Sequence, residues 1–182
     1  PRLDIFMLWD FGLNPTCIIT QRTPLGPWNF LDCMVGDGIG VEELIQNWVR
    51  PLWEDRYAKL KCTIRHIGDP AGLTREASSS ARSAVRAVRH HMGGTWRSGP
   101  VKLRERLDPL QSALTRTVGG RGMIQVDRDR CPQLWHALRG GYYFHVSRTG
   151  ITSSEPVKNI HSHPGDAAGY GAAVLYPIGR AI

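Results

Sequence analysis

The sequence lacks three patterns, each of which would have assigned it to a class of protein. No window of eighteen consecutive apolar residues occurs, so we expect no membrane-spanning helix and no membrane partner. The phosphate-binding pattern G-x-x-x-x-G-K followed by Ser or Thr is absent, which excludes ATP hydrolysis by that route. The four cysteines, Cys17, Cys33, Cys62 and Cys131, are far apart and form no C-x-x-C pair. This spacing argues against a zinc knuckle and a disulfide scaffold, and favours reduced cysteines that mostly serve as packing residues.

The length and charge of the chain limit its organisation and its partners. Its 182 residues fit one domain, residues 1–182, with enough apolar sequence to bury a core. Because the chain starts at Pro1, directly before an apolar segment, we expect a fragment of a longer protein or a processed chain. The net charge of +7 favours a polyanionic partner such as nucleic acid, although a solvated basic surface would give the same surplus.

The first part of the chain predicts a three-strand meander, an amphipathic helix and a fourth strand. The predicted strands are residues 3–11, 16–22, 28–35 and 61–68, and the helix is residues 41–53 with a kink at Pro51. The nearly unbroken apolar run at 3–11 is typical of a central strand buried on both faces. A strand, a crossover helix and another strand predict that the fourth strand pairs in parallel with an earlier one.

The second part predicts helices around a short strand and a hairpin. The expected elements are a helix capped within Ser78 to Ser80 and reaching His91, a helical run at 102–118, a strand at 122–127, a short helix at 132–138, a hairpin of 142–147 with 151–157, and a final helix at 165–175. Leu103, Leu107, Leu110, Leu114 and Val118 share one face of the run at 102–118. Asp108-Pro109 predicts a break in it, with Asp108 capping a new helix.

Three aspartates stand where predicted elements end or begin. Asp10 ends the first strand, Asp69 follows the fourth, and Asp166 lies in the predicted first turn of the final helix. If the first and fourth strands are neighbours, Asp10 and Asp69 lie roughly 5 Å apart. Clustered carboxylates repel one another, and a hard cation such as Mg²⁺ or Mn²⁺ relieves that repulsion. Two such ions roughly 4 Å apart can hydrolyse a phosphodiester.

Each aspartate also has a purely structural interpretation. Asp10 and Asp69 precede glycine or proline and can be turn residues, and Asp166 can complement a helix N-terminus. His163, three residues before Asp166, can point the same way and bind metal or assist proton transfer. It can equally be a packing or capping residue.

Several basic residues are candidates for contacting phosphates. Arg82, Arg86 and Arg89 form a stripe at helical spacing, while Lys158 and Arg148 come from the hairpin region before Asp166. A solvated helix face or pairing with acids explains the stripe as well. Lys158 and Arg148 are the better candidates because they are close to Asp166 in sequence.

Three segments resemble the acidic motifs of the nuclease domains of tailed-bacteriophage large terminases. They are Trp9-Asp10-Phe11-Gly12-Leu13-Asn14-Pro15, Ile67-Gly68-Asp69-Pro70-Ala71-Gly72 and His161-Ser162-His163-Pro164-Gly165-Asp166-Ala167-Ala168-Gly169-Tyr170. Their order and the long helical insert before the last motif also match, and residues 122–139 resemble the stretch before the final hairpin. The resemblance covers nearly the whole chain.

The resemblance implies a fold, an activity and partners. The fold is α/β and ribonuclease H-like: a mixed sheet, with an antiparallel three-strand meander and parallel strands, flanked by helices. Asp10, Asp69 and Asp166 would bind catalytic Mg²⁺ or Mn²⁺, two ions during catalysis, with His163 at the site. The activity would be endonucleolytic cleavage of double-stranded viral DNA concatemers during genome packaging, in the host cell cytoplasm.

The same resemblance implies parts that this chain lacks. Large terminases carry an N-terminal ATPase motor, which is absent here, and they work with a portal and a small terminase subunit. Two alternatives stay open: another ribonuclease H-like nuclease, such as a Holliday-junction resolvase or a transposase, and a non-catalytic DNA-binding or docking module.

Overall fold

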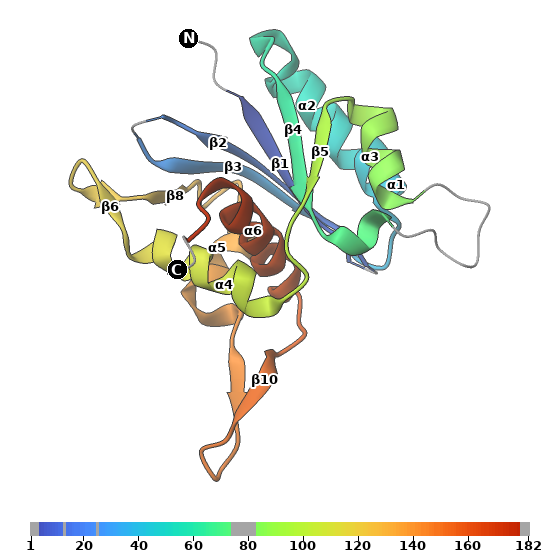
Figure 1. Cartoon of the computed structure of the whole chain (residues 1–182). Helices are drawn as coiled ribbons and strands as arrows, with labels where there is room; N and C mark the ends of the chain where they lie inside the picture. Colours follow the sequence, from blue (N-terminus) through green and yellow to red (C-terminus); the bar gives the residue numbers. More distant parts are fainter. Residues whose placement is uncertain (1–3, 13, 25, 74–82, 179–182) are drawn as a thin grey trace.

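The computed structural model describes residues 4–12, 14–24, 26–73 and 83–178. Within these ranges, six strands form one mixed sheet with helices on both faces (Figure 1). Across the sheet the strands lie in the order β5–β4–β1–β2–β3–β8. Their bounds are β1 Ile5–Asp10, β2 Thr16–Arg22, β3 Trp28–Val35, β4 Ile64–Gly68, β5 Thr95–Ser98 and β8 Ile124–Val126.

Strand directions confirm the predicted fold class. β1, β2 and β3 pair in antiparallel order and form the meander. β4 is parallel to β1, β5 is parallel to β4, and β8 is parallel to β3. β5 has no counterpart among the predicted strands, because four half-exposed residues of mixed polarity give no alternating pattern long enough to detect.

One face of the sheet is covered by α1 Val41–Leu44, α2 Arg50–Arg56 and α3 Ala84–Met92. A π-helical segment, Ile45–Val49, joins α1 to α2, so the predicted helix is continuous. The wider turn directly precedes Pro51, whose ring would clash with the carbonyl four residues earlier in a regular helix. The side chains buried on this face include Ile5, Met7, Trp9, Cys17, Ile19, Leu44, Ile45, Val49 and Val88.

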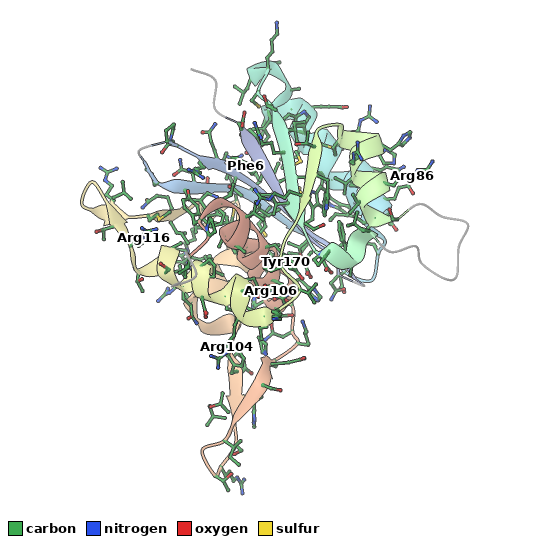
Figure 2. All side chains as sticks on the ribbon, in the orientation of Figure 1. Phe6, Arg86, Arg104, Arg106, Arg116 and Tyr170 are labelled. Atoms are coloured by element: carbon green, nitrogen blue, oxygen red, sulfur yellow. The ribbon has the colours of Figure 1, made fainter. Side chains whose placement is uncertain are left out.

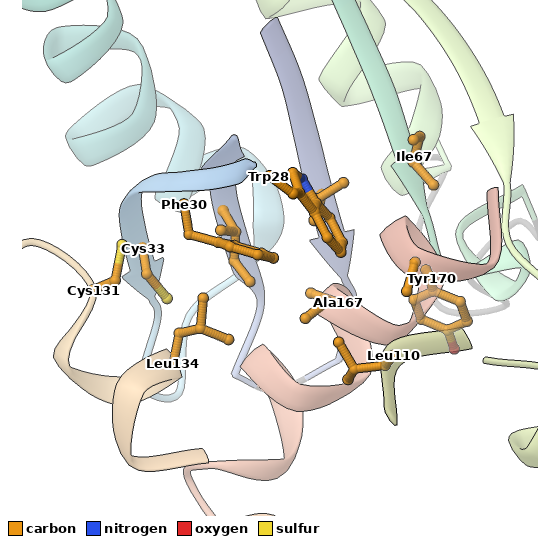
Figure 3. Close-up of a cluster of buried hydrophobic side chains, with 13 residues drawn as sticks. Trp28, Phe30, Cys33, Ile67, Leu110, Cys131, Leu134, Ala167 and Tyr170 are labelled. Atoms are coloured by element: carbon orange, nitrogen blue, oxygen red, sulfur yellow. The ribbon is translucent and has the colours of Figure 1, made fainter. Parts of the chain in front are cut away.

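The other face is covered by α4 Leu103–Thr115, α5 Pro132–His136 and α6 Ser162–Leu175. A π-helical segment, Ala137–Gly141, extends α5. Figure 3 shows the core on this face, which includes Leu8, Trp28, Phe30, Cys33, Ile67, Leu110, Cys131, Leu134 and Ala167. Since Leu8 packs here while Met7 and Trp9 pack on the opposite face, β1 is buried on both sides, as predicted. All four cysteines are free and three are buried, in agreement with their predicted packing role.

The predicted break at Asp108-Pro109 is wrong, because α4 runs through Pro109 without interruption. An internal proline costs a helix roughly 3 kcal/mol. Here Leu107, Pro109 and Leu110 are buried, and α4 packs on α6, so tertiary packing offsets the penalty. Leu114 is exposed, contrary to the predicted apolar face, and the helix ends at Thr115.

Two further boundaries differ from the predictions. The predicted cap at Ser78 to Ser80 and the basic residue Arg82 lie outside the described residues, whereas α3 begins at Ala84 and Ser83 is its N-cap. α6 begins at Ser162, so Asp166 lies one turn inside the helix instead of in its first turn.

Two small hairpins complete the described chain: β6 Thr117–Val118 with β7 Arg121–Gly122, and β9 Phe144–Val146 with β10 Thr152–Pro156. No helix in the described ranges has the length and apolarity needed to cross a membrane.

Hydrogen bonds of the buried His66 side chain connect β4 to β1 and to the C-terminal end of α3. Trp9 Nε1 donates to His66 Nδ1 at 3.1 Å, so Nε2 carries the ring hydrogen and donates to the Gly93 carbonyl at 3.0 Å. The pKa of His66 is lowered to about 4, mainly by burial and also by the positive charge of Arg89, while the hydrogen bond to the Gly93 carbonyl opposes the shift. The ring is therefore neutral in the folded protein at neutral pH.

We expect His66 to make the fold acid-sensitive. Because its pKa is lower in the folded than in the unfolded chain, its stabilising contribution is complete above about pH 6.5 and is lost as the pH falls towards 4. For this shift the loss between pH 7 and pH 4.5 is about 2 kcal/mol. Urea denaturation of wild type and His66→Asn at both pH values measures it, and the variant should lose about 2 kcal/mol less.

His145→Asn is the matched control, since this histidine is exposed on β9 and should leave the pH response as in wild type. If His66→Asn and wild type lose equal stability over this pH interval, the assignment of acid sensitivity to His66 is wrong.

Candidate active site

Asp10 and Asp69 are brought side by side by the parallel register of β1 and β4. Trp9 lies opposite Gly68, and the Asp69 amide donates to the Trp9 carbonyl at 3.1 Å. A Cβ at position 68 would lie 2.5 Å from that carbonyl oxygen, so only glycine lets the two strands approach this closely. The two aspartates that follow these paired residues therefore leave the same end of the sheet.

Asp166 reaches the same region from α6, which packs across β1, β2 and β4. The helix lies close to the sheet because Gly171 faces Leu8, where a Cβ would come within 2.6 Å of a side-chain carbon. The side chain of Asp166 is only 4% exposed. Its negative charge acts on Asp10, so the predicted convergence of the strand ends and the final helix is what the structure describes.

Three side chains bind the carboxylate of Asp166. Arg106 Nη2 on α4 lies 3.0 Å from Oδ1, and Tyr142 Oη donates to the same oxygen. Lys158 Nζ, in the segment between β10 and α6, lies 3.2 Å from Oδ2. Arg106 also donates to Tyr170 Oη at 2.7 Å, and its guanidinium lies over the Tyr170 ring (Figure 2).

His163 connects the final helix to β1. Its Nδ1 lies 2.8 Å from Asp10 Oδ2, and because an ionised carboxylate can only accept, the ring nitrogen donates. His163 and Asp166 are three residues apart on α6 and so lie on one face of the helix, as predicted.

The cluster perturbs Asp10 most. The pKa of Asp10 is raised from 3.8 to about 6, mainly by burial and also by the charges of Asp166 and Asp69, while the hydrogen bond from His163 opposes the rise. Asp10 therefore carries a charge at neutral pH that the folded protein tolerates at a cost.

Asp69 is half-buried, and its Oδ1 accepts from the Ala71 amide at 2.8 Å, so the predicted turn role is real. Within the described residues, no donor forms a hydrogen bond with the second oxygen of Asp69, Oδ2. Beside it opens a pocket of about 460 Å³ lined by Asp69, Pro70, Ala71, Val101, Arg106 and Tyr170. Asp69 is thus the member of the cluster with direct access to solvent.

As these side chains stand, no three His, Cys, Asp or Glu residues in the described ranges are grouped to hold a metal ion. In this arrangement Arg106 and Lys158 neutralise Asp166, while His163 binds Asp10. The donor set itself, three carboxylates and one imidazole, suits an oxygen-preferring divalent cation. Burial is the main cause of the raised pKa of Asp10, and the neighbouring charges of Asp166 and Asp69 add to it, so a cation beside Asp10 would stabilise its charged form.

The other predicted phosphate-contacting residues lie outside this cluster. Arg86 and Arg89 are exposed on α3, on the opposite face of the sheet from α6 (Figure 2). Arg148 lies in the turn between β9 and β10, at the end of a hairpin that projects from the body of the molecule (Figure 1). Closeness in sequence therefore did not bring Arg148 to Asp166, whereas it did bring Lys158 there.

Arg106, Tyr142 and Tyr170 belong to the site, but the sequence assigned none of them a role there, although Tyr170 ends the third of the motifs that resemble the terminase nucleases. Tyr170 stands one helical turn after Asp166, a spacing that could have identified it. Arg106 is one arginine among several in its segment, and only the packing of α4 on α6 distinguishes it.

Comparison with known proteins supports the fold. The sequence matches no protein-family profile and no curated protein. Among solved structures it is similar to the large terminase of a thermophilic bacteriophage in complex with ADP, with a TM-score of 0.66 and 17% identity over 97% of this chain and 40% of that one. It is also similar to the large terminase nuclease domain of bacteriophage SPP1 with bound Mn, with a TM-score of 0.58 and 13% identity over 92% of this chain and 84% of that one.

A third similar structure is the P22 large terminase nuclease domain, with a TM-score of 0.60 and 12% identity over 96% of this chain and 82% of that one. The chain thus spans about two fifths of the large terminase from the thermophilic bacteriophage and most of each isolated nuclease domain. The structural similarity at these low identities shows a shared fold, and the resemblance drawn from the three acidic motifs is confirmed at that level.

We expect Asp10→Asn to stabilise the metal-free protein. Since the pKa of Asp10 is raised from 3.8 to about 6 on folding, its charge destabilises the fold progressively as the pH rises between these two values, and the penalty is complete above them. Asparagine removes the charge and keeps an oxygen that can accept from His163. The free energy of unfolding at pH 8 in EDTA should therefore rise by about 1–3 kcal/mol, and the gain should shrink at pH 5. Chemical denaturation at both pH values measures it.

Asp37→Asn removes an exposed carboxylate and serves as the control, with an expected change within about 0.5 kcal/mol. A loss of stability in Asp10→Asn at pH 8 would show that Asp10 is not under electrostatic strain.

Proposed function

We propose that this chain is a divalent-metal-dependent endonuclease that cuts double-stranded DNA. The observation that carries the proposal is the convergence of Asp10, Asp69 and Asp166 from β1, β4 and α6. They meet at one end of a sheet whose fold is shared with terminase nuclease domains. Three acidic side chains from distant segments, one of them at a raised pKa, are the ligand set that metal-assisted phosphodiester hydrolysis requires.

Asp10, Asp69 and Asp166 would hold Mg²⁺ or Mn²⁺. When bound, the cation supplies charge stabilisation for the phosphate and lowers the pKa of a bound water. The Mn in the SPP1 nuclease domain, a similar fold, supports this choice of cation.

The remaining side chains position this ligand set. Arg106 and Tyr142 fix Oδ1 of Asp166 from α4 and from the segment before β9. His163 holds Oδ2 of Asp10 and is the nearest group able to take up or release a proton there. The pocket beside Asp69 leaves one side of the cluster open to a substrate.

DNA is the proposed substrate because the chain carries a net charge of +7 and places Lys158 and Arg106 among its acidic residues. Arg86, Arg89 and Arg148 would contact the backbone farther from the scissile bond, and Arg82 stays a candidate phosphate contact outside the described residues. By its likeness to large terminases, the domain would act on concatemeric viral DNA in the host cytoplasm, together with an ATPase motor, a portal and a small terminase subunit.

A second function has one observation in its favour. Both oxygens of Asp166 are bound by protein cations, and no group in the described residues is arranged for metal as it stands. A DNA-binding or docking module that keeps the nuclease fold without catalysis would have this arrangement.

We expect wild type to nick supercoiled plasmid in Mg²⁺ or Mn²⁺ and to be inactive in EDTA. Asp69→Asn and Asp166→Ala should each lower the rate by more than about 100-fold, because each removes a proposed metal ligand. The assay is plasmid nicking, with circular dichroism to show that both variants are folded. Asp55→Asn, which removes a carboxylate that is 78% exposed on α2, on the opposite face of the sheet from α6, should retain wild-type activity.

Full activity in Asp69→Asn would rule out the metal-ligand assignment. DNA binding without cleavage in either metal would favour the docking module, and preferred cutting of four-way junctions over linear duplex would favour a resolvase.

A further inference from the structure

The two cations on Asp166 are held in different ways. The Arg106 side chain is 13% exposed, and three contacts hold it: Asp166 Oδ1 at 3.0 Å, Tyr170 Oη at 2.7 Å and the Tyr170 ring at 4.8 Å. The Lys158 side chain is 64% exposed, and in the described part of the chain Asp166 is the one partner of its ammonium. Arg106 is therefore built into the fold, whereas Lys158 approaches the carboxylate from solvent.

The burial of Asp166 explains why a cation stands on each of its oxygens. An ionised carboxylate that is 4% exposed is costly unless positive groups or hydrogen bonds compensate it. Arg106 and Tyr142 compensate Oδ1, which leaves Oδ2 to Lys158. Oδ2 is then the oxygen of Asp166 on which one cation can be replaced by another.

Two positive charges cannot share one carboxylate oxygen without repelling each other. A divalent cation that uses Oδ2 must therefore displace the Lys158 ammonium. That displacement is easy, because an exposed lysine returns to water with little loss and its flexible stem needs no change in the backbone. Arg106 cannot leave in the same way, because Tyr170 and the packing of α4 on α6 retain it.

We propose that Lys158 is a resident cation of the active site, which neutralises Asp166 in the metal-free protein and competes with a divalent cation for Oδ2. The proposal rests on the proposed metal dependence. Lys158 is thereby a positioning residue that sets the metal concentration at which the site becomes occupied, and Arg106 is the permanent counterion of the same carboxylate.

The test is direct binding of Mn²⁺, measured by electron paramagnetic resonance of the free ion, without DNA and without turnover. Lys158→Met keeps the length and apolar stem of the side chain and removes the charge. It should bind Mn²⁺ about 2- to 5-fold more tightly than wild type, a range set by the weakness of an exposed ion pair. Lys158→Arg restores a cation and should return the affinity to about the wild-type value.

Lys59→Met is the matched control. Lys59 is exposed in the turn before β4, at the opposite end of that strand from Asp69, and its loss lowers the net charge by the same amount. An Mn²⁺ affinity that rises equally in Lys59→Met and Lys158→Met reflects overall charge and overturns the proposal. Unchanged or weaker binding in Lys158→Met also overturns it.

Thermal unfolding in EDTA gives an independent readout. Lys158→Met should unfold at a lower temperature than Lys59→Met, because it leaves Oδ2 of the buried carboxylate without its cation, and added Mn²⁺ should raise its unfolding temperature more. Absence of plasmid cleavage by wild type would remove the proposed nuclease function while the Mn²⁺ titration still decides the role of Lys158. Absence of Mn²⁺ binding in both wild type and Lys158→Met would remove both.

Discussion

The parallel pairing of β1 with β4 sets the geometry on which the candidate site depends. Gly68 lets the chain pass within hydrogen-bonding distance of the Trp9 carbonyl, and the next residue on each strand is an aspartate. Two carboxylates then lie at one strand spacing, at the end of the sheet where α6 adds a third. Because β1 is buried on both faces, a slip of one residue would move Trp9 to the face covered by α6 and disrupt the packing on both sides of the sheet, so the register is firmly specified.

The three carboxylates repel one another, and neighbouring side chains compensate their negative charge to different degrees. Arg106, Lys158 and Tyr142 compensate Asp166, whereas Asp10 has only the hydrogen bond from His163 and keeps a raised pKa. Asp69 faces a solvent-accessible pocket. A bound divalent cation would therefore be stabilised most beside the carboxylates whose negative charge the protein compensates least.

Much of this arrangement could be predicted from sequence, because it rests on local patterns. Alternating and continuous apolar runs identified β1 to β4, and the positions of Asp10 and Asp69 at strand ends followed from them. His163 and Asp166 were paired by helical spacing. Arg106, Tyr142 and the uninterrupted path of α4 through Pro109 depend instead on contacts between segments far apart in the chain. Local sequence does not show whether such packing outweighs the local cost of a proline or a charge. Nor does closeness in sequence guarantee closeness in space, because Arg148 lies at the end of a projecting hairpin.

The glycine content of α6 has a consequence for biosynthesis. Gly165 and Gly171 allow close packing against Tyr142 and Leu8, but they and Gly169 each lower the intrinsic stability of the helix by about 1 kcal/mol. Such a segment is not helical until the sheet and α4 are present to pack against it. A ribosome-bound chain that has emerged only as far as β10 has its first two aspartates in place and no third, so a nascent domain cannot assemble the complete carboxylate cluster before its last helix has folded.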